Sequence, residues 1–158
     1  MSSYERPFRE LQEVAAPGAH VVDAAHTETL SVTVVFTTVV ATLEALREAG
    51  RLASHLGAPV RVLVPCVVPY PLDLTRPRVD PLLRLRHFRT VCDRHSVETS
   101  LDVRLCRDKL RCILDALAPR SLVLVGGYRS FWPWTCENLL TQELRDKGHD
   151  VIFVETKK

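Results

Sequence analysis

The sequence pattern is clearest at residues 121–127, which read Ser-Leu-Val-Leu-Val-Gly-Gly. A short apolar run without alternation is typical of a strand that is covered on both faces. Pro119 ends the helical pattern before this run, and a second helical pattern follows at about 135–147, where Gly148 stops it. A buried strand between two helices is the repeating unit of a parallel sheet.

The same unit recurs along the chain. Strand-like runs lie at 31–36, 60–68, 101–105 and 151–154, and helix-like runs at 39–56, 81–95 and 110–117. This alternation predicts an α/β fold, with a doubly wound, Rossmann-like parallel sheet of five strands in the order 3-2-1-4-5 and helices on both faces. We therefore expect one domain over residues 31–158, preceded by an extension, 1–30, that holds a short helix and a linker.

Composition narrows the classes of partner. A length of 158 residues suits one domain, and a net charge of +2 does not favour nucleic acid or an anionic membrane as a partner. No apolar run approaches the roughly 18 residues of a membrane helix, and the N-terminus lacks the pattern of a signal peptide. We expect a cytoplasmic protein.

The cysteines predict neither disulfides nor metal. They are Cys66, Cys92, Cys106, Cys112 and Cys136, an odd number without a Cys-x-x-Cys motif. We expect them to be buried thiols that act as small hydrophobic side chains. His87 and His95 lie near Cys92 on one predicted helix, but the three do not share a face, so no metal site is expected.

The order and lengths of these elements resemble the universal stress protein family over residues 31–155. The first half carries the resemblance at 43–57, Leu-Glu-Ala-Leu-Arg-Glu-Ala-Gly-Arg-Leu-Ala-Ser-His-Leu-Gly, followed by Pro-Val-Arg-Val-Leu-Val-Pro at 59–65. The second half carries it at 121–127, followed by a helix, Gly148 and a closing strand. The resemblance implies the fold given above and a regulatory role in the stress response.

The resemblance also implies a homodimer. In that family the last strand often pairs across a two-fold axis, and here that strand is Val151-Ile152-Phe153-Val154. An edge strand exposes unpaired backbone groups, which pairing with a second copy satisfies. The alternative is that the N-terminal segment, through Tyr4, Phe8 and Leu11, covers this edge and leaves a monomer.

The sequence departs from the nucleotide-binding members of that family at two places. Where those members have an acidic residue after the first strand, this chain has Thr37-Thr38, and their long glycine loop is reduced to Gly126-Gly127. A phosphate cradle needs bare backbone amides, which glycines supply. We therefore expect no cofactor, and ATP or another nucleotide is disfavoured. Trp132 and Trp134, which stand in this loop, either fill the space or form a contact surface.

A ligand in such a sheet binds where the strand order reverses, between the ends of the first and fourth strands. The residues expected to line this crevice are Thr37, Thr38, Gly126, Gly127, Tyr128 and Arg129. Thr38 stands at a helix N-terminus, which favours anions, and Arg129 offers a fork of donors. The alternative is that the glycines form a tight turn and the threonines only cap the helix.

Three functions remain open. The first is a non-enzymatic regulatory or partner-binding protein of universal stress protein type, with a degenerate nucleotide site. The second is a nucleotide-binding or small-anion-binding protein that uses the crevice. The third, a small hydrolase or transferase, has no recognisable acid, base and nucleophile in the sequence, so no catalytic residue is named and a non-enzymatic role is favoured.

Overall fold

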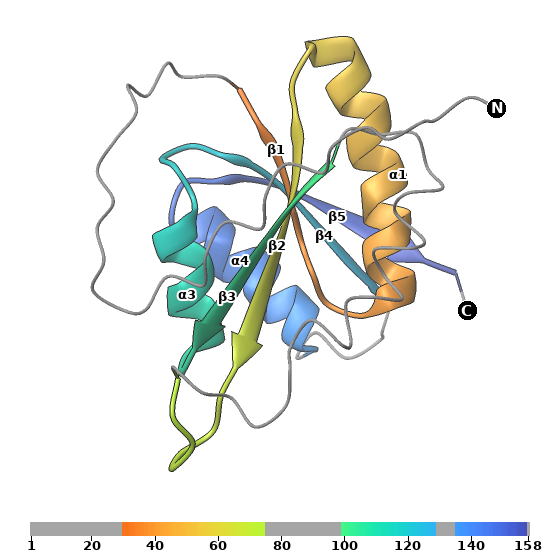
Figure 1. Cartoon of the computed structure of the whole chain (residues 1–158). Coiled ribbons are helices and arrows are strands. Elements are labelled where there is room, and N and C mark those ends of the chain that lie inside the picture. The colour runs from red at the N-terminus through yellow and green to blue at the C-terminus, as the bar shows by residue number, and fades with distance from the viewer. Residues whose placement is uncertain (1–29, 75–98, 129–134, 158) are drawn as a thin grey trace, which may run out of the picture.

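The structure is a computed structural model, and it describes residues 30–74, 99–128 and 135–157. The predicted helices at 4–16 and 81–95 lie outside these ranges, as do Arg129, Trp132 and Trp134. The described elements, in chain order, are β1 (Val32–Val35), α1 (Val39–Leu56), β2 (Val60–Val67), β3 (Thr99–Cys106), α3 (Lys109–Ala116), β4 (Leu122–Tyr128), α4 (Cys136–Asp146) and β5 (Asp150–Thr156) (Figure 1).

The five strands form one parallel sheet in the order β3-β2-β1-β4-β5, which confirms the predicted topology. β1 is central, and its Val32 is in register with Val60 of β2 and Leu122 of β4. α1 covers one face of the sheet, and α3 and α4 cover the other (Figure 1). All four residues of β1 are buried, and three of them are valines.

The core has two layers, one on each face of the sheet. On the α1 face, small side chains of the helix meet valines of the strands, and Ala41, Ala45, Ala49 and Ala53 are all buried. Their spacing of four residues lines one side of the helix and lets its backbone approach the sheet closely. On the other face, Ile113 of α3 and Leu144 of α4 are fully buried against Val35, Leu63, Val123 and Val125.

Capping residues fix the ends of the helices. The hydroxyl oxygen of Thr38 accepts from the amide of Ala41 at 3.3 Å, and Gly57 closes α1 in the left-handed region with a φ of 62°. Thr135 caps α4 in the same way through the amide of Asn138, and Gly148 follows that helix with a φ of 86°. The helix boundaries predicted at Thr38, Gly57 and Gly148 are confirmed.

β2 contains a proline in its interior. Leu63 lies opposite Val35, the last residue of β1, and its carbonyl accepts from the amide of Phe36 at 2.9 Å. Residues of a strand alternate in the direction of their backbone groups, so the nitrogen of Pro65 points to the same side as Leu63. β1 has ended at that level, and the missing N–H therefore costs no bond to β1.

The described cysteines are less buried than the sequence predicts. Cys66, Cys106 and Cys112 are half-buried and Cys136 is exposed. Cys66 and Cys106 lie at the ends of β2 and β3, Cys136 begins α4, and Cys112 lies within α3. Within residues 30–74, 99–128 and 135–157, no helix is long and apolar enough to cross a membrane.

Candidate functional site

The candidate site lies at the carboxyl ends of β1 and β4, next to the start of α1 (Figure 1). These strands are neighbours in the sheet, yet the chain leaves β1 for β2 on one side and reaches β4 only later on the other. The structure therefore brings Thr37 and Thr38 to the same edge as Gly126, Gly127 and Tyr128. Arg129, the sixth predicted residue, lies outside the described part of the chain.

Thr37 joins the two strand ends directly. Its hydroxyl donates to the carbonyl oxygen of Gly126 at 2.8 Å, and its amide donates to the hydroxyl of Thr42 at 3.1 Å. Thr42 is completely buried, so both bonds of Thr37 point into the molecule. The hydroxyl that was expected to face a ligand is thus used to close the space between β1 and β4.

Thr38 is exposed and serves as the N-cap of α1. Its side chain accepts from Ala41 and its carbonyl accepts from the amide of Thr42 at 2.9 Å. One of the free amides at this helix start is therefore already satisfied by the protein itself. The positive end of the helix dipole remains at this edge, because α1 is 18 residues long and has no acidic residue in its first turn.

Gly126 belongs to β4, and the alternative prediction of a tight turn at Gly126-Gly127 is wrong. Neither glycine has a positive φ, and β4 continues through both to Tyr128. A Cβ at position 126 would lie 2.0 Å from the carbonyl oxygen of Ala41. The bare backbone of Gly126 is therefore occupied by the first turn of α1.

Gly127 faces the opposite side of the sheet. A Cβ there would lie 2.8 Å from the ring of Phe153 and 3.1 Å from the side chain of Glu137. The missing side chain makes room for the Phe153 ring, which crosses from β5 over the end of β4. Tyr128, the last residue of β4, has 41% of its surface exposed and lies opposite Thr156.

A second polar cluster, absent from the sequence prediction, lies between β2, β3 and α3. Arg61 donates to the carbonyl of Ala116 at 3.0 Å and stands 3.7 Å from the carboxylate of Asp102, which also binds Arg104 at 3.1 Å. Burial lowers the pKa of Arg61, and the nearby Asp102 only partly opposes this. The sequence does indicate this cluster through Arg61, which is a charged residue inside an otherwise apolar strand.

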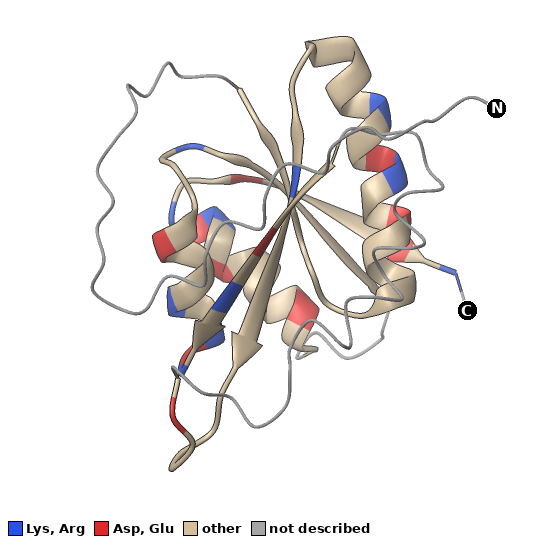
Figure 2. Cartoon of the chain, viewed as in Figure 1, with Lys and Arg blue, Asp and Glu red and all other residues tan. Residues whose placement is uncertain are grey.

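Residues of both charge signs are interspersed along the described helices and strands (Figure 2). On α1, Glu44 pairs with Arg47 and Glu48 with Arg51, one turn apart. Among the described residues, no three His, Cys, Asp or Glu side chains are grouped so as to hold a metal ion.

The fold is similar to that of a solved protein. A crystal structure of a protein from the universal stress protein family of Burkholderia pseudomallei superposes with a TM-score of 0.50 and 14% sequence identity. The similarity covers 81% of this chain and 98% of that chain, and at this identity it shows a shared fold alone. No protein-family model and no curated protein matches the sequence.

Proposed function

We propose that this protein is a non-enzymatic, partner-binding protein of universal stress protein type, which pairs with a second copy of itself through β5 and does not bind nucleotide. The observation that carries the proposal is the hydrogen bond between Thr37 and Gly126. It occupies the point at which a nucleotide would meet the ends of β1 and β4. Gly126, whose bare backbone a phosphate would need, packs instead against Ala41.

Self-association is supported by the position and composition of β5. This strand stands at one end of the sheet and pairs with β4 along its inner side. Ile152, Phe153 and Val154 are only half-buried although they are apolar. A second β5 running antiparallel would cover them and use the outward backbone groups.

A nucleotide-binding or small-anion-binding protein is the second candidate. It is favoured by the exposed start of α1, where Thr38 stands at the positive end of a long helix without a neighbouring acidic residue. The two candidates differ in one measurable property, the affinity for a phosphate-bearing ligand.

Calorimetric titration of the full chain with ATP and magnesium separates them. We expect no heat of binding at ligand concentrations up to about 100 µM. An affinity of about 10 µM corresponds to about 7 kcal/mol, which a ligand gains only from a formed site. Binding at that level would establish the second candidate, and inorganic phosphate in the same titration would show whether the phosphate alone is recognised.

A further inference from the structure

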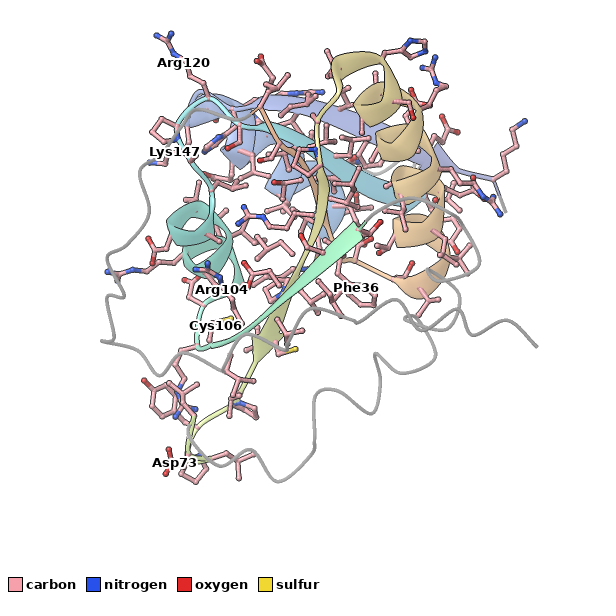
Figure 3. All side chains as sticks on the ribbon, turned by 45° about the horizontal axis from the view of Figure 1, so that its top comes forward. Phe36, Asp73, Arg104, Cys106, Arg120 and Lys147 are labelled. Atoms are coloured by element: carbon pink, nitrogen blue, oxygen red, sulfur yellow. The ribbon has the colours of Figure 1, made fainter. Side chains whose placement is uncertain are left out.

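Two cysteine side chains lie near each other where the chain passes from β3 to α3. Cys106 is the last residue of β3, and Cys112 lies in the first half of α3, which begins at Lys109. Figure 3 shows Cys106 at this end of β3, close to α3. The two side chains are hydrogen-bonded to each other, and both are half-buried, so a small molecule can reach them.

The hydrogen bond distinguishes the two thiols. It lowers the pKa of Cys106, which burial otherwise raises, and it raises the pKa of Cys112, which burial and the neighbouring Cys106 carry to about 12. Cys112 is therefore the donor, and Cys106 is the sulfur on which negative charge is better tolerated. The thiolate is the nucleophile in thiol oxidation, so Cys106 is the sulfur that reacts first.

We propose that Cys106 and Cys112 form a redox modification site, at which a hydroperoxide converts the two thiols into an intramolecular disulfide. The hydrogen bond places the two thiols next to each other, and a disulfide requires their sulfurs to approach to about 2.05 Å. Cys106 is the thiol that reacts with the peroxide, and Cys112 is the resolving thiol. This site is separate from the candidate site at β1 and β4 and does not depend on the proposed function.

The reaction balances with hydrogen peroxide as the oxidant. An electron pair of the Cys106 sulfur attacks one peroxide oxygen, the O–O bond breaks, and water leaves with the thiol proton as Cys106 becomes a sulfenic acid. The Cys112 sulfur then attacks the Cys106 sulfur, the S–O bond breaks, and a second water leaves. Two thiols and one peroxide thus give one disulfide and two waters.

The environment predicts slow formation and slow reversal. Few thiolates are present at neutral pH when burial raises the pKa of both thiols, so oxidation is slower than that of an exposed cysteine. The same property makes each sulfur a poor leaving group, so a monothiol reduces the disulfide slowly. The site is suited to recording sustained oxidation rather than to rapid signalling.

The neighbourhood of Cys106 suggests what the disulfide would hold in place. Its carbonyl accepts from the amide of Val68 at 2.8 Å. The adjacent Arg107 donates to the carbonyls of Val68 and Leu72, at 2.7 and 2.6 Å, and lies 4.1 Å from the centre of the exposed Tyr70 ring. A disulfide to α3 would fix the base of this segment, so the amides of residues 107–112 should exchange more slowly with solvent in the oxidised protein.

Peptide mapping of the oxidised full chain tests the proposal. Trypsin places the five cysteines on five different fragments, which are 62–78, 90–94, 105–107, 112–120 and 130–145. We expect hydrogen peroxide, followed by alkylation of the remaining thiols and digestion, to yield 105–107 joined to 112–120. Dithiothreitol should separate the pair again, while Cys136 on 130–145 reports that the oxidant was active.

Serine variants fix the order of events. Cys112→Ser should leave Cys106 as a sulfenic acid that dimedone labels, whereas Cys106→Ser should leave Cys112 reduced and unlabelled. Joining of 105–107 to 62–78, which carries Cys66, would overturn the proposed pairing. Recovery of both fragments fully alkylated, after an exposure to peroxide much longer than the one that oxidises the exposed Cys136, would overturn the site itself. This result needs only the unmodified sequence.

Discussion

Gly126 lies in β4 against the first turn of α1, and no side chain fits there. We expect Gly126→Ala to lower the free energy of unfolding by about 3 kcal/mol, because the added methyl group would meet the backbone oxygen of Ala41. Gly57→Ala is the matched control, since a Cβ at Gly57 meets open space and costs only the left-handed strain of about 1 kcal/mol. Urea denaturation measures both, and equal losses for the two variants would contradict the packing described for Gly126.

Thr37 binds the end of β1 to the end of β4 with a single hydroxyl. Thr37→Val keeps the shape of the side chain and removes the donor to Gly126, so the carbonyl at 126 loses its partner. We expect a loss of about 1–2 kcal/mol in the free energy of unfolding. Thr37→Ser retains the hydroxyl and should recover most of it. If serine and valine are equally destabilising, the methyl group rather than the hydrogen bond matters at this position.

The sequence predicted where these residues lie, but not what they bind. Thr37, Thr38 and Gly126 fall at one edge because a parallel order places all strand ends together, and strand order follows from the alternation of elements. Whether the hydroxyl of Thr37 faces a ligand or Gly126 depends on how closely α1 approaches β4. That distance is set by the small alanine side chains of α1. Their effect on the position of α1 can be seen only once the helix is packed against the sheet.

The end of β4 also depends on packing that the sequence pattern does not show. The apolar run of the fourth strand stops at Val125, and glycine weakens a strand, yet β4 continues through both glycines to Tyr128. The ladder to β5 extends from Leu122 opposite Asp150 to Tyr128 opposite Thr156, and these bonds hold both glycines extended. The low strand propensity of glycine is outweighed here by pairing with β5 and by packing against α1. Neither of these neighbours can be recognised from residues 121–127 alone.

The cluster between β2, β3 and α3 sets two opposing effects against each other. Burial makes the charge of Arg61 costly, while Asp102 and the carbonyl of Ala116 compensate for it. Arg61→Met removes the charge and its cost together, so we expect the free energy of unfolding to change by less than about 1 kcal/mol. Asp102→Asn leaves Arg61 half-buried beside Arg104 without a counter-charge, and we expect a loss of about 1–2 kcal/mol.

Thermal or urea unfolding of the natural chain, the two single variants and the double variant, which is the fourth corner of the cycle, measures this asymmetry. Asp102→Asn should be nearly harmless once Arg61 is methionine, because the buried charge that needs a partner is gone. The interpretation fails if Arg61→Met is the more damaging of the two single changes.

For the whole molecule, the topology was predictable because the signals agree. Apolar runs, helix stops at Gly57 and Gly148, and the right-handed rule for crossovers leave a few strand orders, and the sheet has the predicted one, 3-2-1-4-5. The similarity to a universal stress protein structure, with a TM-score of 0.50, is consistent with that order. The residues that would pair two copies could not be predicted from the sequence, because they depend on which backbone groups of β5 face outward.

The backbone of β5 now identifies those groups. The amide of Asp150 donates to Ser121, so residue 150 and every second residue after it face β4. Phe153 therefore faces outward, as does Val151, whose carbonyl accepts from Arg145 at 2.9 Å. An antiparallel pair of β5 strands centred on Phe153 would join the amide and carbonyl of one copy to those of the other.

Sedimentation velocity of the full chain at micromolar concentration tests this proposal, with Phe153→Pro and Phe153→Ala as a matched pair. Both variants lose the ring, but only proline removes the outward amide. We expect the natural chain and Phe153→Ala to sediment at twice the chain mass of 17.8 kDa, and Phe153→Pro to sediment as a folded single chain. A natural chain that sediments at 17.8 kDa, or a Phe153→Pro variant that remains paired, would contradict association through β5.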